Sequence, residues 1–131
     1  MSQYNIFLVD DDEDDIYLAR LTFNDHFADW KLTSFNDGQE LIDYLLEQPA
    51  HPLPTLVILD LNMPRLTGFE TLTVLKKQDR WHRIPVAILT TSSSPEDRTR
   101  SEELGACAFI TKPATIEQLA RVIADGKAVY S

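Results

Sequence analysis

Four short apolar runs in this chain each end in polar residues of the types that phosphoryl chemistry uses. The runs and their endings are Ile6 to Val9 with Asp10 and Asp11, Thr55 to Leu59 with Asp60, Pro85 to Leu89 with Thr90, and Ala108 to Thr111 with Lys112 and Pro113. If these runs are parallel strands of one sheet, their carboxyl ends share one edge. Three carboxylates, a hydroxyl and an ammonium would then meet there. This set predicts a phosphate-accepting site assisted by a metal ion.

The three carboxylates need a cation if they converge. Two like charges about 4 Å apart repel by roughly 4 kcal/mol at an effective dielectric constant near 20. Mg²⁺ suits an oxygen-rich, water-accessible site that also engages phosphate, because it prefers one or two carboxylates plus substrate oxygens. Zinc is not indicated, since the three histidines and the single cysteine are far apart in the sequence.

An aspartate carboxylate can act as a nucleophile toward phosphorus and form an aspartyl phosphate. Asp60 ends the middle run and is the best placed of the three acids. The charge on the transferred group would be stabilised by the metal ion, by the Lys112 ammonium and by a hydroxyl or amide near Thr90.

The apolar runs alternate with segments of helical periodicity, about five times along the chain. Strands are expected near residues 5–10, 30–35, 55–59, 85–89 and 108–111. The first helix is expected to carry Ile16, Ala19, Phe23 and Phe27, and later helices to start at Asp37 or Gly38, Thr67 or Gly68, Ser94 with Pro95, and Thr115.

The strand-like runs do not alternate with polar residues, as Val57 to Leu59 and Val86 to Leu89 show. Continuous apolar strands are typical of a parallel sheet covered by helices on both faces. The pattern therefore predicts a doubly wound α/β fold. The 131 residues fit a single domain, so we expect one domain over residues 1–131 and no output domain.

Composition argues against several classes of partner. The net charge of -9 argues against nucleic-acid binding, which requires a basic patch. The small basic group from Lys76 to Arg83 is more typical of a solvated helix end. The N-terminus lacks a signal-peptide pattern and no apolar stretch has membrane-spanning length, so we expect a cytoplasmic protein without membrane contact. The single Cys107, flanked by apolar residues, is predicted to be a buried, unreactive side chain in a reducing compartment.

These motifs together resemble the receiver domain of bacterial two-component response regulators over essentially the whole chain. Val9-Asp10-Asp11 is similar to the family's acidic pair, and the segment from Ile58 to Pro64, followed by Gly68, is similar to its phosphoacceptor segment. Leu89-Thr90-Thr91 resembles the switch strand and Lys112-Pro113 the terminal motif. The resemblance implies a flavodoxin-like sheet of five parallel strands in the order 2-1-3-4-5, with five helices.

The resemblance also implies a role for each site residue. Asp60 would take a phosphoryl group from a histidine kinase or a phosphotransfer protein. Asp11 would bind Mg²⁺ directly, Asp10 would hold a metal-bound water, and Asn62 would offer its backbone carbonyl to the ion. The chain would then be a phosphoacceptor that catalyses only its own phosphorylation and dephosphorylation.

In the family, signalling follows from a switch that Thr90, Phe109 and the fourth helix would form here. Thr90 would move toward the phosphoryl oxygen, Lys112 would pair with that group, and Phe109 would move inward. Phosphorylation adds about -1.5 to -2 charges, which can bias a two-state element. The downstream partner would be a protein, and the chain would be a monomer or a phosphorylation-dependent homodimer.

The acidic run continues from Asp12 through Asp15. A calcium-loop motif is excluded, because Asp15 stands where the turn glycine should be and Leu21 where the bidentate acid should be. Most of the run is predicted to start the first helix. For Asp12 two interpretations stay open, namely a hydrogen bond that tunes the acidic pair and a solvated first-turn acid.

Two other functions are compatible with parts of the pattern. A haloacid dehalogenase-type aspartyl-phosphate hydrolase also uses a strand-end aspartate, Mg²⁺ and lysine, but it places its Asp-x-Asp motif on the first strand. The other is a receiver-fold interaction domain that is not phosphorylated. Single-domain regulators paired with phytochrome-type kinases have a similar acidic stretch and Thr-Thr-Ser-Ser segment.

The Pro-rich segment 48–54 is predicted to be a surface feature with a role in partner recognition.

Overall fold

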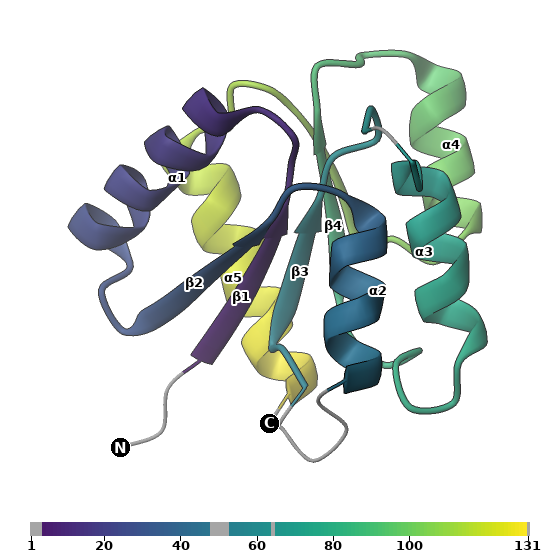
Figure 1. Ribbon diagram of the computed structural model, residues 1–131. Helices are drawn as coiled ribbons and strands as arrows, with labels where there is room; N and C mark the ends of the chain where they lie inside the picture. Colours follow the sequence, from purple (N-terminus) through teal and green to yellow (C-terminus); the bar gives the residue numbers. More distant parts are fainter. Residues whose placement is uncertain (1–3, 48–52, 64, 131) are drawn as a thin grey trace.

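The computed structural model describes residues 4–47, 53–63 and 65–130. Strands and helices alternate along the chain, and helices cover both faces of a central sheet (Figure 1). The elements are β1 (Tyr4–Val9), α1 (Glu13–His26), β2 (Trp30–Phe35), α2 (Gly38–Glu47), β3 (Leu56–Leu59), α3 (Gly68–Lys77), β4 (Val86–Thr90), α4 (Pro95–Glu103), β5 (Ala108–Thr111) and α5 (Ile116–Tyr130).

The sheet has the strand order β2-β1-β3-β4-β5, and every neighbouring pair is parallel. This confirms the predicted fold class and strand order. β1 lies between β2 and β3, so the chain leaves the sheet centre in both directions and a switch in direction occurs between β1 and β3. In sheets of this kind, ligands bind outside the carboxyl ends of the strands at that point.

Side chains of each strand divide between two hydrophobic cores, one on each face. In β1, Phe7 and Val9 pack with α2 and α3, whereas Ile6 and Leu8 pack with α1 and α5. This alternation is the period of two that a strand imposes. Burial on both faces explains why the central strand β3 has no polar residue, whereas the edge strand β2, which is mostly half-buried, carries several.

Local sequence signals set the helix starts at that edge. Asp12 caps α1, because its side chain accepts hydrogen bonds from the backbone N–H groups of Asp14 and Asp15. Thr67 and Glu70 form a reciprocal capping box at the start of α3. Ser94 caps α4 and Pro95 occupies its first turn, as predicted.

Helix α4 is little buried against the rest of the molecule. Among its nine residues, all of which the structure describes, Ser101 alone is buried, and its hydroxyl donates back to a backbone carbonyl within the helix. Two arginines of α4 also lie over aromatic rings of neighbouring elements. Arg98 lies over the Phe109 ring at 5.0 Å and Arg100 over the Phe69 ring at 4.2 Å. Such cation–π contacts contribute about 0.5–1 kcal/mol at exposed sites.

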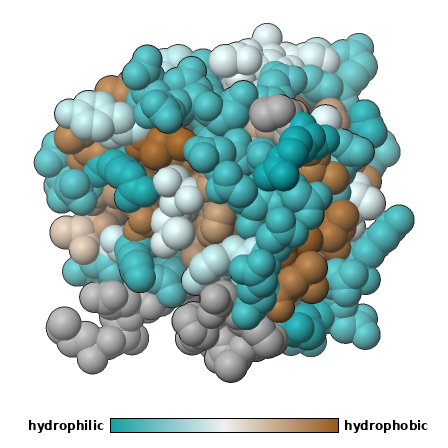
Figure 2. Space-filling view, viewed as in Figure 1, coloured by the Kyte–Doolittle hydropathy of each residue, from teal (hydrophilic) through white to brown (hydrophobic). Residues whose placement is uncertain are grey.

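The face of the molecule shown in Figure 2 is largely polar, because hydrophilic side chains cover most of it. Tyr17, Leu18 and Leu21 are exposed large hydrophobic residues on α1. Within the described ranges, the helices are all too short or too polar to cross a membrane.

The prediction for Cys107 is wrong in one respect. The residue is exposed, because it lies in the bend just before β5 rather than within the strand. Partial desolvation by its neighbours still raises the pKa of the thiol above its ordinary value, which keeps it protonated near neutral pH. The predicted surface role of segment 48–54 lies mostly outside the described residues.

Candidate functional site

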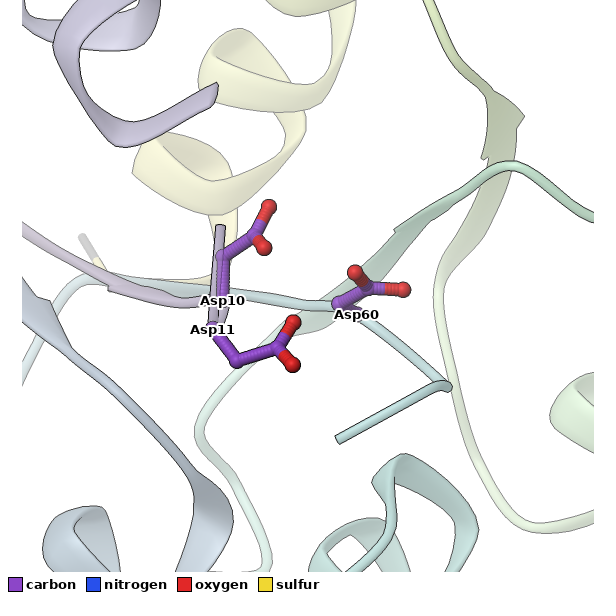
Figure 3. A group of neighbouring side chains, drawn as sticks. All are labelled: Asp10, Asp11 and Asp60. Carbon is purple, nitrogen blue, oxygen red and sulfur yellow. The ribbon is translucent and has the colours of Figure 1, made fainter. Parts of the chain in front are cut away.

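The structure brings the predicted site residues to one edge of the sheet. Asp10 and Asp11 follow β1, Asp60 follows β3, Thr90 ends β4, and Lys112 follows β5. The carboxylates of the three aspartates lie side by side at the ends of two adjacent strands (Figure 3). The parallel pairing of β1, β3, β4 and β5 is what places residues up to 102 positions apart at the same edge.

The three carboxylates form a group that suits a hard divalent cation. One oxygen from each of Asp10, Asp11 and Asp60 lies within 4.8 Å of the others. Asp10 and Asp60 are only 2% and 7% exposed, whereas Asp11 is exposed. A site that is anchored on buried carboxylates and open to water on one side matches the preference of Mg²⁺, which retains several water ligands.

Burial makes the ionised form of Asp10 costly. Desolvation raises the pKa of its carboxyl group, and the nearby charge of Asp60 raises it further. Hydrogen bonds from the Lys112 ammonium and from the backbone N–H of Asp12 act in the opposite direction without cancelling the effect. The site therefore carries uncompensated negative charge that a bound cation would offset.

Lys112 is the positive group that faces the carboxylates. Its ammonium donates to Asp10 at 2.8 Å, to Asp15 at 2.7 Å and to Asp60 at 3.1 Å. Desolvation lowers the pKa of this ammonium, but the hydrogen bonds to Asp10 and Asp15 and the charge of Asp60 raise it well above its ordinary value. Lys112 is thus a permanent cation in contact with a carboxylate oxygen of Asp60.

Two backbone features hold the loop that carries Asp60. The backbone N–H of Asn62 donates to Asp60 Oδ1 at 3.3 Å, and the Asn62 side chain is exposed. Gly68 packs directly against the backbone of Asp60 and Leu61, leaving no space for a Cβ atom. The loop therefore returns tightly to α3, which fixes the direction of the Asp60 carboxylate.

Thr90 is fully buried at the end of β4. Its hydroxyl oxygen accepts a long hydrogen bond, 3.4 Å, from the backbone N–H of Ser92. The Ser92 hydroxyl in turn donates to the Asp97 carboxylate in the first turn of α4 at 2.7 Å. A chain of hydrogen bonds thus joins the end of β4 to α4. On the adjacent strand, Phe109 is 8% exposed beneath the Arg98 guanidinium.

The structure confirms the hydrogen bond from Asp12 to the acidic pair and places Asp12 at the N-cap of α1 rather than in its first turn. Its side chain caps α1, and its backbone N–H donates to Asp10 Oδ1 at 2.9 Å. Asp15 was not predicted to be a site residue, yet it reaches Lys112 from the first turn of α1. A signal was available, because helical side chains point toward the helix N-terminus and first-turn acids are thereby directed at the strand ends.

A second ion pair at the same edge was also missed. The Arg65 guanidinium donates to both oxygens of Asp37, at 2.9 and 3.0 Å, and so ties the loop after β3 to the loop after β2. Asp37 is buried and its carboxylate also accepts the backbone N–H of Glu40 at the start of α2. Arg65 has a positive φ of 62°, an uncommon conformation for a residue with a side chain.

Comparison with known proteins agrees with this geometry. The family model described as the response regulator receiver domain matches residues 6–124. Response regulator Rcp1 of Synechocystis is 32% identical over 121 residues, covering 90% of this chain and 82% of Rcp1. The structure of the Mn²⁺-bound form of Rcp1 is 30% identical, with a TM-score of 0.78 and coverage of 97% of this chain and 94% of that one.

The bacteriophytochrome response regulator AtBRR is also similar. Its structure is 32% identical, with a TM-score of 0.84, and the match covers 97% of this chain and 94% of that one. These likenesses confirm the predicted resemblance and favour it over the haloacid dehalogenase-type alternative. The chain belongs to the response regulator receiver family, the phosphoacceptor modules of two-component signal transduction.

Proposed function

We propose that Asp60 is the phosphoacceptor of this receiver domain and that the transfer depends on Mg²⁺. A carboxylate oxygen of Asp60 attacks the phosphorus of a phosphohistidine, and the bond from phosphorus to the imidazole nitrogen breaks. The observation that carries this proposal is the convergence on Asp60 of the Lys112 ammonium and the carboxylates of Asp10 and Asp11. The chain itself catalyses only its phosphorylation and dephosphorylation.

Four residues would hold the metal ion. Asp10, Asp11 and Asp60 offer carboxylate oxygens within 4.8 Å of one another, and Asn62 lies in the loop directly after Asp60. Bound Mg²⁺ would neutralise negative charge on the phosphoryl oxygens. Lys112, already 3.1 Å from Asp60, would supply the second positive charge through a direct contact.

The signalling step would be a switch made of Thr90, Phe109 and α4. The Thr90 hydroxyl is buried and is only weakly bound by Ser92, at 3.4 Å, so it can turn to a phosphoryl oxygen at low cost. Its departure would break the first link of the hydrogen-bond chain that leads through Ser92 to Asp97 in α4. Phe109 lies on β5, the strand next to β4, and contacts α4 through the Arg98 guanidinium over its ring.

The phosphodonor would be a histidine kinase or a phosphotransfer protein, and the similarity to AtBRR favours a phytochrome-type kinase. The output would be a contact with a protein. A nucleic-acid partner is disfavoured by the net charge of -9. Light scattering with and without a phosphoryl mimic would show whether phosphorylation converts a monomer to a homodimer; an unchanged mass would exclude that conversion.

Intact-protein mass spectrometry tests the phosphoacceptor directly. Incubation with acetyl phosphate and Mg²⁺ should add one phosphoryl group, and both Asp60→Asn and a chelator should abolish the addition. Asp25→Asn, which removes an exposed carboxylate from α1, is the matched control and should be phosphorylated like the wild type. A folded wild-type protein that gains no mass, even from a phosphohistidine donor, would instead favour the non-phosphorylated interaction domain.

A further inference from the structure

The Lys112 ammonium has already committed its hydrogen bonds. A lysine ammonium carries three N–H donors and no acceptor. The structure gives it three carboxylate partners, at 2.8 Å for Asp10, 2.7 Å for Asp15 and 3.1 Å for Asp60. A phosphoryl oxygen arriving at Asp60 would be a fourth acceptor for three donors. One of the present contacts therefore has to break before Lys112 can bind that oxygen with full strength.

The three contacts are not equally easy to break. The Asp10 side chain is 2% exposed, so loss of its partner would leave a buried carboxylate unpaired. Asp60 is the acceptor itself and is 9% exposed at its side chain. The Asp15 side chain is 36% exposed, and water can replace Lys112 there. Asp15 is thus the partner that Lys112 can leave at the lowest cost, although it makes the shortest contact.

There is room for the lysine to move. A pocket of about 180 Å³ lies between the first turns of α1 and the segment after β5, and it is lined by Asp10, Asp15, Leu18, Phe23, Lys112 and Leu119, among others. Because the pocket borders the Lys112 stem, a change of its rotamer does not have to displace closely packed side chains. The side chain can therefore change conformation and release Asp15, while its ammonium already lies 3.1 Å from Asp60.

We propose that Asp15 is a positioning residue that competes with the phosphoryl group for Lys112. In the unphosphorylated protein it holds the ammonium at the mouth of the site, and on phosphorylation it gives the ammonium up. This inference rests on the proposed function, because it requires a phosphoryl group on Asp60. Its consequence is that the wild-type protein binds a phosphoryl group less tightly than its acceptor site alone would allow.

Beryllofluoride with Mg²⁺ provides a test, since it coordinates a carboxylate oxygen and imitates a phosphoryl group without turnover. Asp15→Asn should bind it about 2- to 5-fold more tightly than the wild type, the range that follows from losing a partly exposed competing ion pair. Asp15→Ala should bind it at least as tightly as Asp15→Asn, because the asparagine carbonyl still accepts a hydrogen bond. Calorimetric titration measures both affinities.

Asp14→Asn is the matched control. Asp14 is an exposed carboxylate in the same turn of α1, and the substitution removes the same charge. At physiological ionic strength, where charges are screened over about 8 Å, it should change the affinity by less than about 1.5-fold. In ¹⁹F spectra, the resonance of the bound fluoride nearest Lys112 should shift in Asp15→Asn and stay in place in Asp14→Asn, a change that loss of stability alone would not produce.

The outcomes separate the two proposals. A wild-type protein that does not bind beryllofluoride would overturn the proposed function and this inference with it. If the wild type binds but Asp15→Asn binds with equal affinity, Asp15 does not compete for Lys112. If Asp15→Asn binds more weakly, Asp15 directs the ammonium toward the phosphoryl group rather than away from it, and the inference is wrong.

Discussion

Replacement of Gly68 by alanine should damage both the fold and the phosphoacceptor site. An added Cβ would lie 2.5 Å from the Leu61 Cα and still closer to the Asp60 carbonyl oxygen. Carbon atoms in contact prefer about 3.5–4.0 Å, so the loop must move by roughly 1 Å. Overpacking of this kind costs about 1–3 kcal/mol. For a domain of this size, that lowers the melting temperature by about 3 to 15 °C.

The same displacement moves Asp60 away from Lys112 and its neighbouring carboxylates. A misplacement of about 1 Å can cost a reaction roughly 100-fold, so we expect phosphorylation of Gly68→Ala by acetyl phosphate to slow by about 10- to 100-fold. Urea unfolding gives the stability, and the rate of mass gain gives the reactivity.

Gly126→Ala is a control with the opposite expected sign. Gly126 lies within α5, and an added Cβ would meet its nearest atoms only at 3.5 Å, an ordinary contact. Replacing a helical glycine by alanine under these conditions should stabilise the protein by about 0.5–1 kcal/mol. If Gly68→Ala were as stable and as reactive as the wild type, the close approach of α3 to the acceptor loop would not constrain Asp60, and the reasoning would be refuted.

Three further predictions concern charge. Burial alone would raise the pKa of Asp37, but hydrogen bonds from Arg65 outweigh burial and lower this pKa below its ordinary value of 3.8. The ionised Asp37 therefore stabilises the fold above that pH, and this stabilisation is lost as the pH falls. Urea unfolding of Asp37→Asn should therefore depend less on pH below about 4 than that of the wild type. With a chelator present, Asp10→Asn should raise the free energy of unfolding, because the substitution removes a buried carboxylate whose pKa is raised by burial. Added Mg²⁺ should stabilise this variant less than it stabilises the wild type. An equal response to Mg²⁺ would exclude Asp10 from the metal site. Arg98→Ala should lower the free energy of unfolding by about 0.5–1 kcal/mol and speed the hydrogen exchange of the β5 backbone amides near Phe109. Exchange rates equal to those of the wild type would contradict a stabilising cation–π contact.

The parts of the site that lie on strands were predictable from the sequence. Each strand end is marked by an abrupt change from apolar to polar residues, and parallel pairing then brings Asp10, Asp60 and Lys112 together whatever their separation along the chain. The helix starts were also predictable from the sequence, because a capping residue such as Ser94 bonds only to backbone groups of the residues that follow it.

Contacts between loops were not predictable in this way. The Arg65–Asp37 ion pair joins residues 28 positions apart in two loops, and no periodic pattern relates them. The Asp15–Lys112 contact was predictable only in part: its place in the first turn of α1 directs this acid toward the strand ends, but the angle at which α1 leaves β1 decides whether it reaches Lys112. Cys107 was assigned to the interior because its sequence neighbours are apolar, but the bend before β5 turns it outward.

Because α4 is composed mostly of polar residues, its sequence can change with little effect on the folding of the domain. Because this helix contributes Ser101 alone to the buried interior, among residues that are all described, little of the hydrophobic free energy of the domain depends on its sequence. Its outward positions are therefore open to substitution by random mutation without unfolding the protein. A gene duplicate could acquire a new binding specificity through α4 while keeping its core and its phosphoacceptor chemistry intact.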